Sequence, residues 1–351
     1  MKKRNVVFLL LLVFTLSLVL TACGGAKQEA PAPASTSTDA KVEPAKTYEI
    51  KVATWFDPTH PLVKSLEKFK EIIETKTEGN VKVSIFPSSQ LGSEDTFIDS
   101  VKAGTVEMGI SGTMINTYAP LIAVAEKPYL FQSWDHAKRA YFDEKIGDIM
   151  AEGIIDKAGF RVLGESVNGW RMISSSKKIN TFEDLKGLRL RVPNVPYYIK
   201  MAEAWGATAT PMSLAELFTA LEQKVVDGQD NPYATVKTSS FYEVQPYMVH
   251  TGHLFTPNFW ILNEKFFQSL SEDYQKIVED AAVEAILYNW KISQENEEAD
   301  MKFLEEHGVK IVMPDEEFKT KLVESQKVND AWWFEKYPGS EELVKKIDSL
   351  K

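Results

Sequence analysis

The sequence contains a single cysteine, Cys23, among its 351 residues. One cysteine cannot form a disulfide bond within the chain, so the fold has to be held together by its apolar core. A lone cysteine is also better suited to attachment than to stabilising a fold. We therefore interpret Cys23 as an anchor point.

The chain also lacks an excess of positive charge. It has 40 basic and 50 acidic side chains, which gives a formal net charge of −10. Removal of a leader that holds Lys2, Lys3 and Arg4 would leave 37 basic side chains and a charge of −13. Nucleic-acid binding needs a basic footprint, so this class of function is excluded. The overall field of such an acidic protein does not favour anions, so a local pair of arginines is a more notable sign of an anion site.

Motifs of common catalytic and metal sites are absent as well. The sequence has no Gly-x-Ser-x-Gly nucleophile elbow and no Gly-x-x-x-x-Gly-Lys phosphate loop. Ser174–Ser176 has no evident base partner in the sequence, and His250 and His253 have neither a cysteine nor a paired acid nearby. We expect no catalytic residue, no metal and no cofactor. An exported, lipid-anchored hydrolase remains the competing class of protein.

The start of the chain has the pattern of a signal peptide. Basic residues precede the apolar run Val6–Leu20, whose length of about 15 residues falls short of the ~20 that span a bilayer as a helix. The end of the run, Leu20-Thr-Ala-Cys23, resembles the lipobox of bacterial lipoproteins, whose cysteine is acylated. We predict a signal peptide over 1–22, then acylated Cys23 and a flexible tether over 23–46, rich in Ala, Pro, Ser and Thr. A plain secreted protein is the alternative.

The rest of the chain predicts an α/β fold. Its length, about 300 residues, suits two domains. From Tyr48 to Ser111 the patterns alternate strand–helix–strand–helix–strand, which implies a parallel sheet with right-handed crossovers. A helical pattern over 271–306 is longer than one globular domain usually uses. We therefore expect this helix to pass along both domains.

The stretch Asn168–Pro196 carries two arginines, Arg171 and Arg191, 20 positions apart. Between them, Thr181–Asp184 reads as a capping box that starts a short helix, and Leu188–Val192 alternates as a strand. Both arginines are thus predicted at strand ends, where open α/β sheets bind their ligands. A guanidinium pairs with a carboxylate through two parallel hydrogen bonds. The pair therefore indicates a small organic anion as ligand.

Three segments of the sequence together carry a family resemblance. In their order and spacing they resemble the solute-binding proteins of TRAP transporters, the C4-dicarboxylate-binding (DctP) type, and the likeness runs from Tyr48 to the C-terminus. The resemblance implies a two-domain clamp like that of periplasmic binding proteins (type II-like), with crossing strands and a long domain-spanning helix. The segments are GWRMISSSKKINTFEDLKGLRLRVPNVP, PMSLAELFTALEQKVVDGQDNP and FYEVQPYMVHTGH. The implied domains are 47–168 plus 256–296, and 169–255 plus 297–351.

The resemblance also implies roles for three polar residues. Arg191 would make the main salt bridge to the ligand carboxylate, and Arg171 and Asn231 would assist it. From the residues alone, other interpretations stay open. Arg191 could be a surface residue of an alternating strand, Arg171 could pair with a carboxylate between the domains, and Asn231 could be a turn residue before Pro232.

Further candidates for ligand contact come from the loops and strand ends expected beside the arginines. Small-ligand pockets are lined largely by apolar and aromatic side chains, which favours Trp170 and Phe255. The remaining candidates are Trp55, His60, Gln90 and Thr113 in the first domain and Asn194 and Met212 in the second.

The resemblance places the protein outside the cytoplasm, anchored to the membrane through Cys23, in the periplasm or on the cell surface. It implies that the protein passes a small organic acid to the membrane permease subunits of an ion-gradient-driven TRAP transporter. A C4-dicarboxylate, keto acid, sugar acid or aromatic acid would each offer a carboxylate to Arg191. The binding protein of an ATP-driven importer is the alternative transporter. We expect a monomer without a nucleic-acid partner.

The lipobox interpretation predicts the effect of one substitution. Cys23→Ala removes the thiol that would be acylated, so the protein should leave the membrane fraction and keep its fold. Cell fractionation at high salt, with circular dichroism of the released protein, measures both effects. A variant that still sediments with membranes at high salt would contradict the lipoprotein interpretation.

Overall fold

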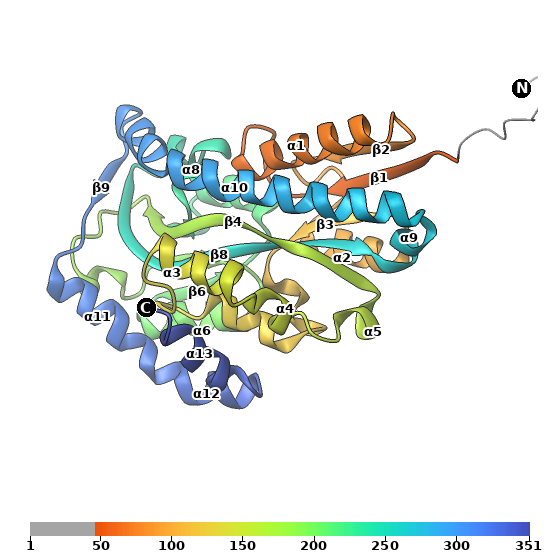
Figure 1. The fold of residues 1–351 in the computed structure, drawn as a ribbon. Coiled ribbons are helices and arrows are strands. Elements are labelled where there is room, and N and C mark those ends of the chain that lie inside the picture. Colours follow the sequence, from red (N-terminus) through yellow and green to blue (C-terminus); the bar gives the residue numbers. More distant parts are fainter. Residues whose placement is uncertain (1–45) are drawn as a thin grey trace, which may run out of the picture. The chain divides into compact units, whose positions relative to one another are not determined.

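The computed structural model describes residues 46–351, without the side chain of Thr113. Residues 1–45, which hold the predicted signal peptide, Cys23 and nearly all of the predicted tether, lie outside the described residues. The described chain is built on a mixed sheet of nine strands in the order β2-β1-β3-β8-β4-β7-β5-β6, with β9 paired to β8 (Figure 1). Among the described helices, none is long and apolar enough to cross a membrane.

The first part of the sheet is parallel, as the sequence predicts. It contains β1 (Tyr48–Ala53), α1 (Pro61–Lys76), β2 (Val81–Phe86), α2 (Glu94–Ala103) and β3 (Met108–Ser111). β1 pairs in parallel with both β2 and β3. Helix α1 forms because apolar residues recur on one face, and that face is buried against the sheet.

Two long antiparallel strands, β4 (Phe160–Ser175) and β8 (Tyr247–Asn263), run through the middle of the sheet. The sequence predicts shorter strands, Phe160–Ser166 and Met248–Phe255, because glycine and proline commonly interrupt strands. Here Gly169, with φ of 110°, and Pro257 lie at a register shift of the β4–β8 pair. Such bulges let a strand bend and continue. The two strands therefore reach from one end of the sheet to the other (Figure 1).

The other end of the sheet is built from short strands and helices. The capping box predicted at Thr181–Asp184 is confirmed, and Ser213–Glu216, whose Ser-x-x-Glu sequence also predicts a capping box, forms a second one. The elements are η4 (Phe182–Leu185), β5 (Arg189–Val192), α6 (Pro196–Ala204), β6 (Thr208–Pro211), α7 (Leu214–Glu222), β7 (Gly228–Asn231), α8 (Tyr233–Thr238), η5 (Phe241–Glu243) and β9 (Lys310–Val312).

The connecting and closing segments are mostly short helices. The stretch 134–158, predicted as mostly helical, is divided into four pieces, and 119–131, predicted as loop-like, contains a 3-10 helix. The remaining elements are η1 (Thr113–Thr117), η2 (Pro120–Glu126), α3 (Trp134–Lys138), η3 (Arg139–Asp143), α4 (Ile146–Met150), α5 (Ile154–Ala158), α9 (Glu264–Ser269), α11 (Glu316–Gln326), η6 (Lys327–Asn329), α12 (Asp330–Lys336) and α13 (Ser340–Asp348).

The predicted long helix is α10 (Glu272–Glu306), with 35 residues. It lies beside α1 and passes over β4 toward α8 (Figure 1). Its first half packs into an apolar core around β1–β3, and Leu304 near its end packs into a second core with residues of α7 and α8. The helix therefore contacts both ends of the sheet. The domain boundaries stated above remain a prediction.

Candidate functional site

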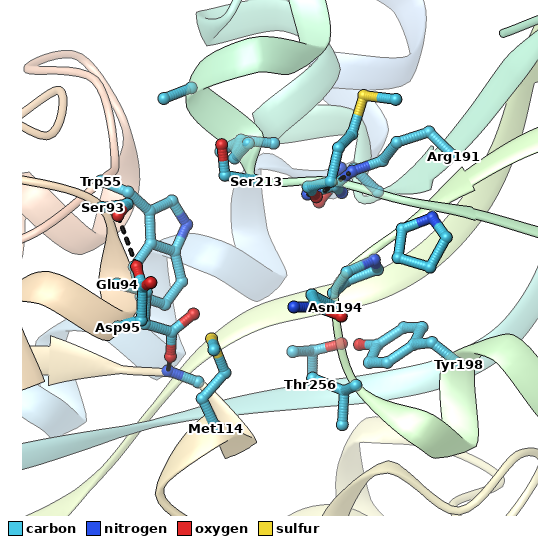
Figure 2. A pocket seen from close by; sticks show the side chains of 18 of the residues that line it. Trp55, Ser93, Glu94, Asp95, Met114, Arg191, Asn194, Tyr198, Ser213 and Thr256 are labelled. Carbon is cyan, nitrogen blue, oxygen red and sulfur yellow. Dashed lines mark hydrogen bonds between the residues drawn. The ribbon is translucent and has the colours of Figure 1, made fainter.

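A cavity of about 610 Å³ lies between the two ends of the sheet. Figure 2 shows Trp55, Ser93, Glu94 and Asp95 on one side of it, facing Arg191, Asn194 and Tyr198 on the other. This volume is typical of sites for small organic molecules. The lining residues are Trp55, Ser89, Ser93, Glu94, Asp95, Gly112, Met114, Glu126, Asn168, Arg171, Arg191, Pro193, Asn194, Val195, Tyr198, Pro211, Met212, Ser213, Leu214, Ala215, Glu216, Asn231, Thr256 and Asn258.

Arg171, on β4, lies on the cavity wall in a buried ion pair. Its Nε lies 2.6 Å from Oδ2 of Asp230, and its Nη2 donates to the Asp230 carbonyl. The guanidinium carbon lies 5.2 Å from the centre of the Tyr198 ring, which is a cation–π contact. The β4–β7 pairing brings these residues together, because it places Asp230 opposite Ile173. The charge of Arg171 is thus largely neutralised by the protein itself.

Asp230 is held in its charged form. Burial alone would raise the pKa of this carboxyl, but the charge of Arg171 and hydrogen bonds from His253 and Arg171 hold it well below its usual range. His253 Nε2 lies 3.2 Å from the same Oδ2 atom. Burial lowers the pKa of His253, although Asp230 opposes this effect. We therefore treat His253 as a neutral donor, which leaves Asp230 and Arg171 as the charged pair.

Arg191, on β5, is buried but has no carboxylate within salt-bridge distance among the described residues. Its Nε and Nη2 both donate to the carbonyl oxygen of Met212, at 3.0 and 2.7 Å. These two bonds fix the plane of the guanidinium and leave Nη1 without a described acceptor. Burial lowers the pKa of Arg191 to about 10, opposed by Asp230 and reinforced by the positive charge of Arg171. The side chain stays protonated at neutral pH, so a buried cation without a counter-ion lines the cavity.

The opposite wall carries a carboxylate, Glu94, in the first turn of α2. Its Oε1 accepts from Ser111 Oγ at 2.9 Å and from the Gly112 amide at 2.7 Å. Burial raises the pKa of Glu94 to about 8, although these two hydrogen bonds oppose the shift. The charges of Glu126 and Asp95 raise it further. This end of the cavity therefore disfavours additional negative charge.

The structure brings most of the predicted site residues in the second domain to the cavity, together with one from the first. Arg171, Arg191, Asn194, Met212 and Asn231 line it, and so does Trp55. Asn231 Nδ2 donates to Gln229 Oε1 at 2.6 Å, so a neighbouring side chain already orients this amide. Ligand contact by these six residues remains a prediction.

Several other predicted residues whose side chains are described do not line this cavity. Gln90 is exposed on the loop after β2, next to the lining residue Ser89. Trp170 and Phe255 pack on each other, with ring centres 5.0 Å apart, and Trp170 lines a separate space of about 20 Å³, which holds little more than one water. Thr113 begins η1, and its side chain lies outside the description.

His60 supports the cavity wall from behind instead of lining it. Its Nδ1 accepts the Leu62 amide hydrogen at the start of α1, so Nε2 carries the ring proton and donates to Oδ1 of Asn168 at 3.1 Å. Thr235 donates to the same Oδ1 atom at 3.0 Å. Burial lowers the pKa of His60 to about 3, with Asn168 opposing. A neutral His60 thus ties α1 to β4 at the lining residue Asn168.

Several lining residues have no counterpart in the sequence-based prediction. Glu94 lies one residue before the predicted start of its helix, at Asp95, and so reads as part of a solvent-exposed turn. Thr256 and Asn258 lie just beyond the predicted end of β8. The signal that could have identified them is the polar pair inside the apolar run HLFTPNFWIL.

The described residues contain no group of three or more His, Cys, Asp or Glu side chains arranged to hold a metal ion. His250 Nδ1 is 2.7 Å from the hydroxyl of Tyr233, and His253 contacts Thr251 and Asp230. The two histidines predicted to be a weak metal candidate therefore have separate hydrogen-bond partners.

A mixed sheet whose long central strands join two α/β halves around a ligand-sized cavity defines a solute-binding protein of the clamp type. Residues 52–334 match the family described as "Bacterial extracellular solute-binding protein, family 7", or DctP, and the chain belongs to this family. The family resemblance and the fold class predicted from the sequence are thereby confirmed.

Similar proteins include one characterised by its ligand and two with solved structures. The 2,3-diketo-L-gulonate-binding periplasmic protein of Escherichia coli is 33% identical over 250 residues, which cover 70% of this chain and 75% of that protein. A TRAP periplasmic solute-binding protein from Haemophilus influenzae with bound L-gulonate has a TM-score of 0.81 and 35% identity, covering 87% and 100% of the two chains. One from Desulfovibrio desulfuricans with bound sn-glycerol-3-phosphate has a TM-score of 0.83 and 32% identity, covering 86% and 97%.

The buried ion pair predicts a pH-dependent loss of stability in Asp230→Asn. Removal of one partner of a buried pair typically costs about 3–5 kcal/mol, so the free energy of unfolding should fall by about this amount at neutral pH. The folded-state pKa of Asp230 lies below the usual 3.8, so its charge stabilises the fold above pH 3.8 and the benefit is lost as the pH falls further. Urea unfolding should therefore show a constant difference down to about pH 5, then a narrowing one.

Asp227→Asn provides a control on the preceding loop. Asp227 is itself buried, but its partners Lys177 and Arg189 are 60% and 46% exposed and can be solvated when the charge is removed, so this change should cost less than Asp230→Asn. Equal losses in the two variants would contradict the assignment of Arg171–Asp230 as the main structural ion pair of the site.

Proposed function

We propose that this protein captures a small organic acid in the cavity by pairing the ligand carboxylate with Arg191, and delivers it to a TRAP permease. The observation that carries the proposal is a buried guanidinium without a counter-ion among the described residues. A buried charge is costly unless it is paired, and the Met212 carbonyl supplies hydrogen bonds but no charge. A ligand carboxylate at Nη1 would complete the pair in water-poor surroundings.

The division of labour between the two arginines supports this proposal. Arg171 is already paired with Asp230, so its charge would attract a ligand carboxylate only weakly. Arg191 is held in one orientation by Met212 before any ligand arrives. Such preorganisation lowers the entropy lost on binding. Arg191 is therefore the primary anion contact, with Arg171 and Asn231 as supporting residues.

The ligands of similar proteins fit an acid with oxygen-rich substituents. The Haemophilus influenzae structure contains L-gulonate, and the Escherichia coli protein is described by its binding of 2,3-diketo-L-gulonate. Both molecules carry one carboxylate and several oxygen substituents. We infer the same broad class, a carboxylate of sugar-acid size, for this chain.

The proposal includes location and partners. An acylated Cys23 would hold the protein at the outer face of a membrane, where its tether would let it reach permease subunits. The protein would act as a monomeric carrier and not as an enzyme. The described part of the serine run supports this, because Ser174 pairs with Gln245 and Gln229, and Ser175 and Ser176 donate to the Asp227 carbonyl, with no base beside them.

Arg191→Ala tests the proposed anion contact. Truncating one partner of a buried charge pair costs about 2–5 kcal/mol, so affinity should fall by roughly 30-fold or more at ~1.4 kcal/mol per tenfold. Arg191→Lys should also bind more weakly because it lacks the planar fork. Isothermal titration calorimetry with a panel of organic acids measures both changes.

Arg189→Ala is the matched control, on the same strand. Arg189 is exposed and pairs with Asp227 outside the cavity. Arg189→Ala removes the same charge from the protein as Arg191→Ala, but it should leave the affinity for organic acids nearly unchanged. Full affinity in Arg191→Ala would remove the proposed site.

Ligand binding should also close the protein. A ligand that contacts both sides of the cavity binds the closed form more tightly, and this difference in affinity shifts the equilibrium. The radius of gyration from solution scattering should therefore decrease when the ligand saturates wild-type protein, and Arg191→Ala should stay open at the same concentration. Identical scattering curves for the empty and saturated wild type would argue against a clamp.

A further inference from the structure

The loop between β1 and α1, residues 54–60, contacts the end of α8 through a carboxylate. Oδ2 of Asp57 accepts a hydrogen bond from Ser239 Oγ at 2.7 Å, although the two residues lie 182 positions apart in the sequence. The other oxygen, Oδ1, accepts from Ser88 Oγ at 3.0 Å. One carboxylate therefore bridges the loop after β2 and the end of α8.

The two ends of this bridge belong to different apolar cores. Phe56, next to Asp57, packs into the core around β1–β3. Val236 and Phe241 lie on either side of Ser239 and pack into the second core, with residues of α7 and α8. The hydrogen bond between Asp57 and Ser239 therefore joins the two halves of the sheet.

Contacts within the first half alone hold Asp57 in place. The Ser88 amide donates to the Phe56 carbonyl at 2.9 Å, and the Ser89 amide donates to the Thr54 carbonyl at 3.1 Å. Ser88 and Ser89 have φ values of 50° and 58°, in the left-handed region, which residues other than glycine keep only where their surroundings fix them. The carboxylate is thus a preorganised acceptor for the second half.

The bridge continues from residues that line the cavity. Trp55, two positions before Asp57, is a lining residue, and so is Ser89 on the loop after β2. On the other side, β7 ends at the lining residue Asn231, and α8 leads from there to Ser239. A ligand that draws the two walls of the cavity together would therefore also bring Asp57 and Ser239 together.

We propose that Asp57 and Ser239 form a latch that stabilises the closed form of the protein. This inference rests on the proposed function, in which a ligand closes the two halves around the cavity. Neither residue is among those that line the cavity. The latch therefore stabilises closure without selecting among ligands, and both residues act as positioning residues.

A latch has a specific effect on binding. A bond made only in the closed form strengthens the binding of every ligand that closes the protein, by the amount that it stabilises this form. A hydrogen bond to a carboxylate is stronger than one between neutral groups. Because the latch has to break before the ligand leaves, its loss should increase the rate of dissociation more than it slows association.

Ser239→Ala tests the latch most directly, because it removes only the bond between the halves. Isothermal titration calorimetry with L-gulonate, galactonate and succinate should show a common loss of about fivefold for every acid that the wild type binds. Stopped-flow tryptophan fluorescence should assign most of this loss to faster dissociation. Urea unfolding of the ligand-free protein should be nearly unchanged, since the open form lacks the bond.

Asp57→Asn gives a second test, in which the direction of the change is informative. Removal of a negative charge should by itself favour the binding of an anion. An amide oxygen is a weaker acceptor than a carboxylate, so the latch predicts weaker binding instead, again by up to about fivefold. The double variant with Ser239→Ala should bind no more weakly than Ser239→Ala alone, because both changes affect one bond. Tighter binding by Asp57→Asn, or losses that multiply in the double variant, would overturn the latch.

Ser84→Ala is the matched control. Ser84 Oγ donates to Glu49 Oε1 at 2.7 Å, which is the same kind of bond at the same length. Both residues lie on the paired strands β1 and β2, so this bond stays within the first half. Affinity and dissociation rate should match the wild type. Equal losses in Ser84→Ala and Ser239→Ala would overturn the latch.

The remaining outcomes distinguish this inference from the proposed function. If Ser239→Ala binds the acids as the wild type does, or loses as much stability without ligand as it loses in affinity, while Arg191→Ala abolishes binding, the latch is overturned and the organic-acid function stands. If folded wild-type protein binds none of the three acids, both are overturned.

Discussion

The ion pair between Arg171 and Asp230 determines how the whole site is charged. Two guanidiniums close together in a buried cavity repel each other, and each is costly to bury alone. Asp230 neutralises Arg171, because the β4–β7 register brings these two residues together. Among the described side chains that line the cavity, Arg191 is then the one cation without a carboxylate partner. The cavity of this acidic protein therefore presents a positive charge on Arg191, whose orientation is fixed by the Met212 carbonyl.

The antiparallel β4–β8 pair gives the site its frame. Arg171 and Asn168 lie on β4, and Thr256 and Asn258 lie on β8. Long strands place side chains more rigidly than loops do, so these positions are set by the sheet. Gly169 and Pro257 flank one bulge of this pair, between Val167 and Gly169. A local bend, where backbone conformation changes most easily, therefore lies beside the residues that line the cavity.

The sequence predicts those features that depend on local periodicity or on family motifs. The parallel β1–β3 unit, both capping boxes, the α10 helix and the two arginines follow from such patterns. Predictions fail where tertiary pairing overrides a local signal, as at Pro257, whose place in a central strand depends on a bulge opposite it. Thr256 and Asn258 were missed for that reason. Asp230 was missed because nothing in a linear sequence shows which of two arginines a buried aspartate will neutralise.

In the proposed function, affinity and selectivity have different sources. One guanidinium recognises any carboxylate and cannot tell a sugar acid from a fatty acid. Discrimination therefore requires further groups that are costly to leave unpaired, and the buried polar atoms of Thr256 and Asn258, which have no partner among the described residues, are such groups. In the proposed clamp, a molecule that contacts only Arg191 would gain little from closure, so selectivity and closing would depend on the same contacts.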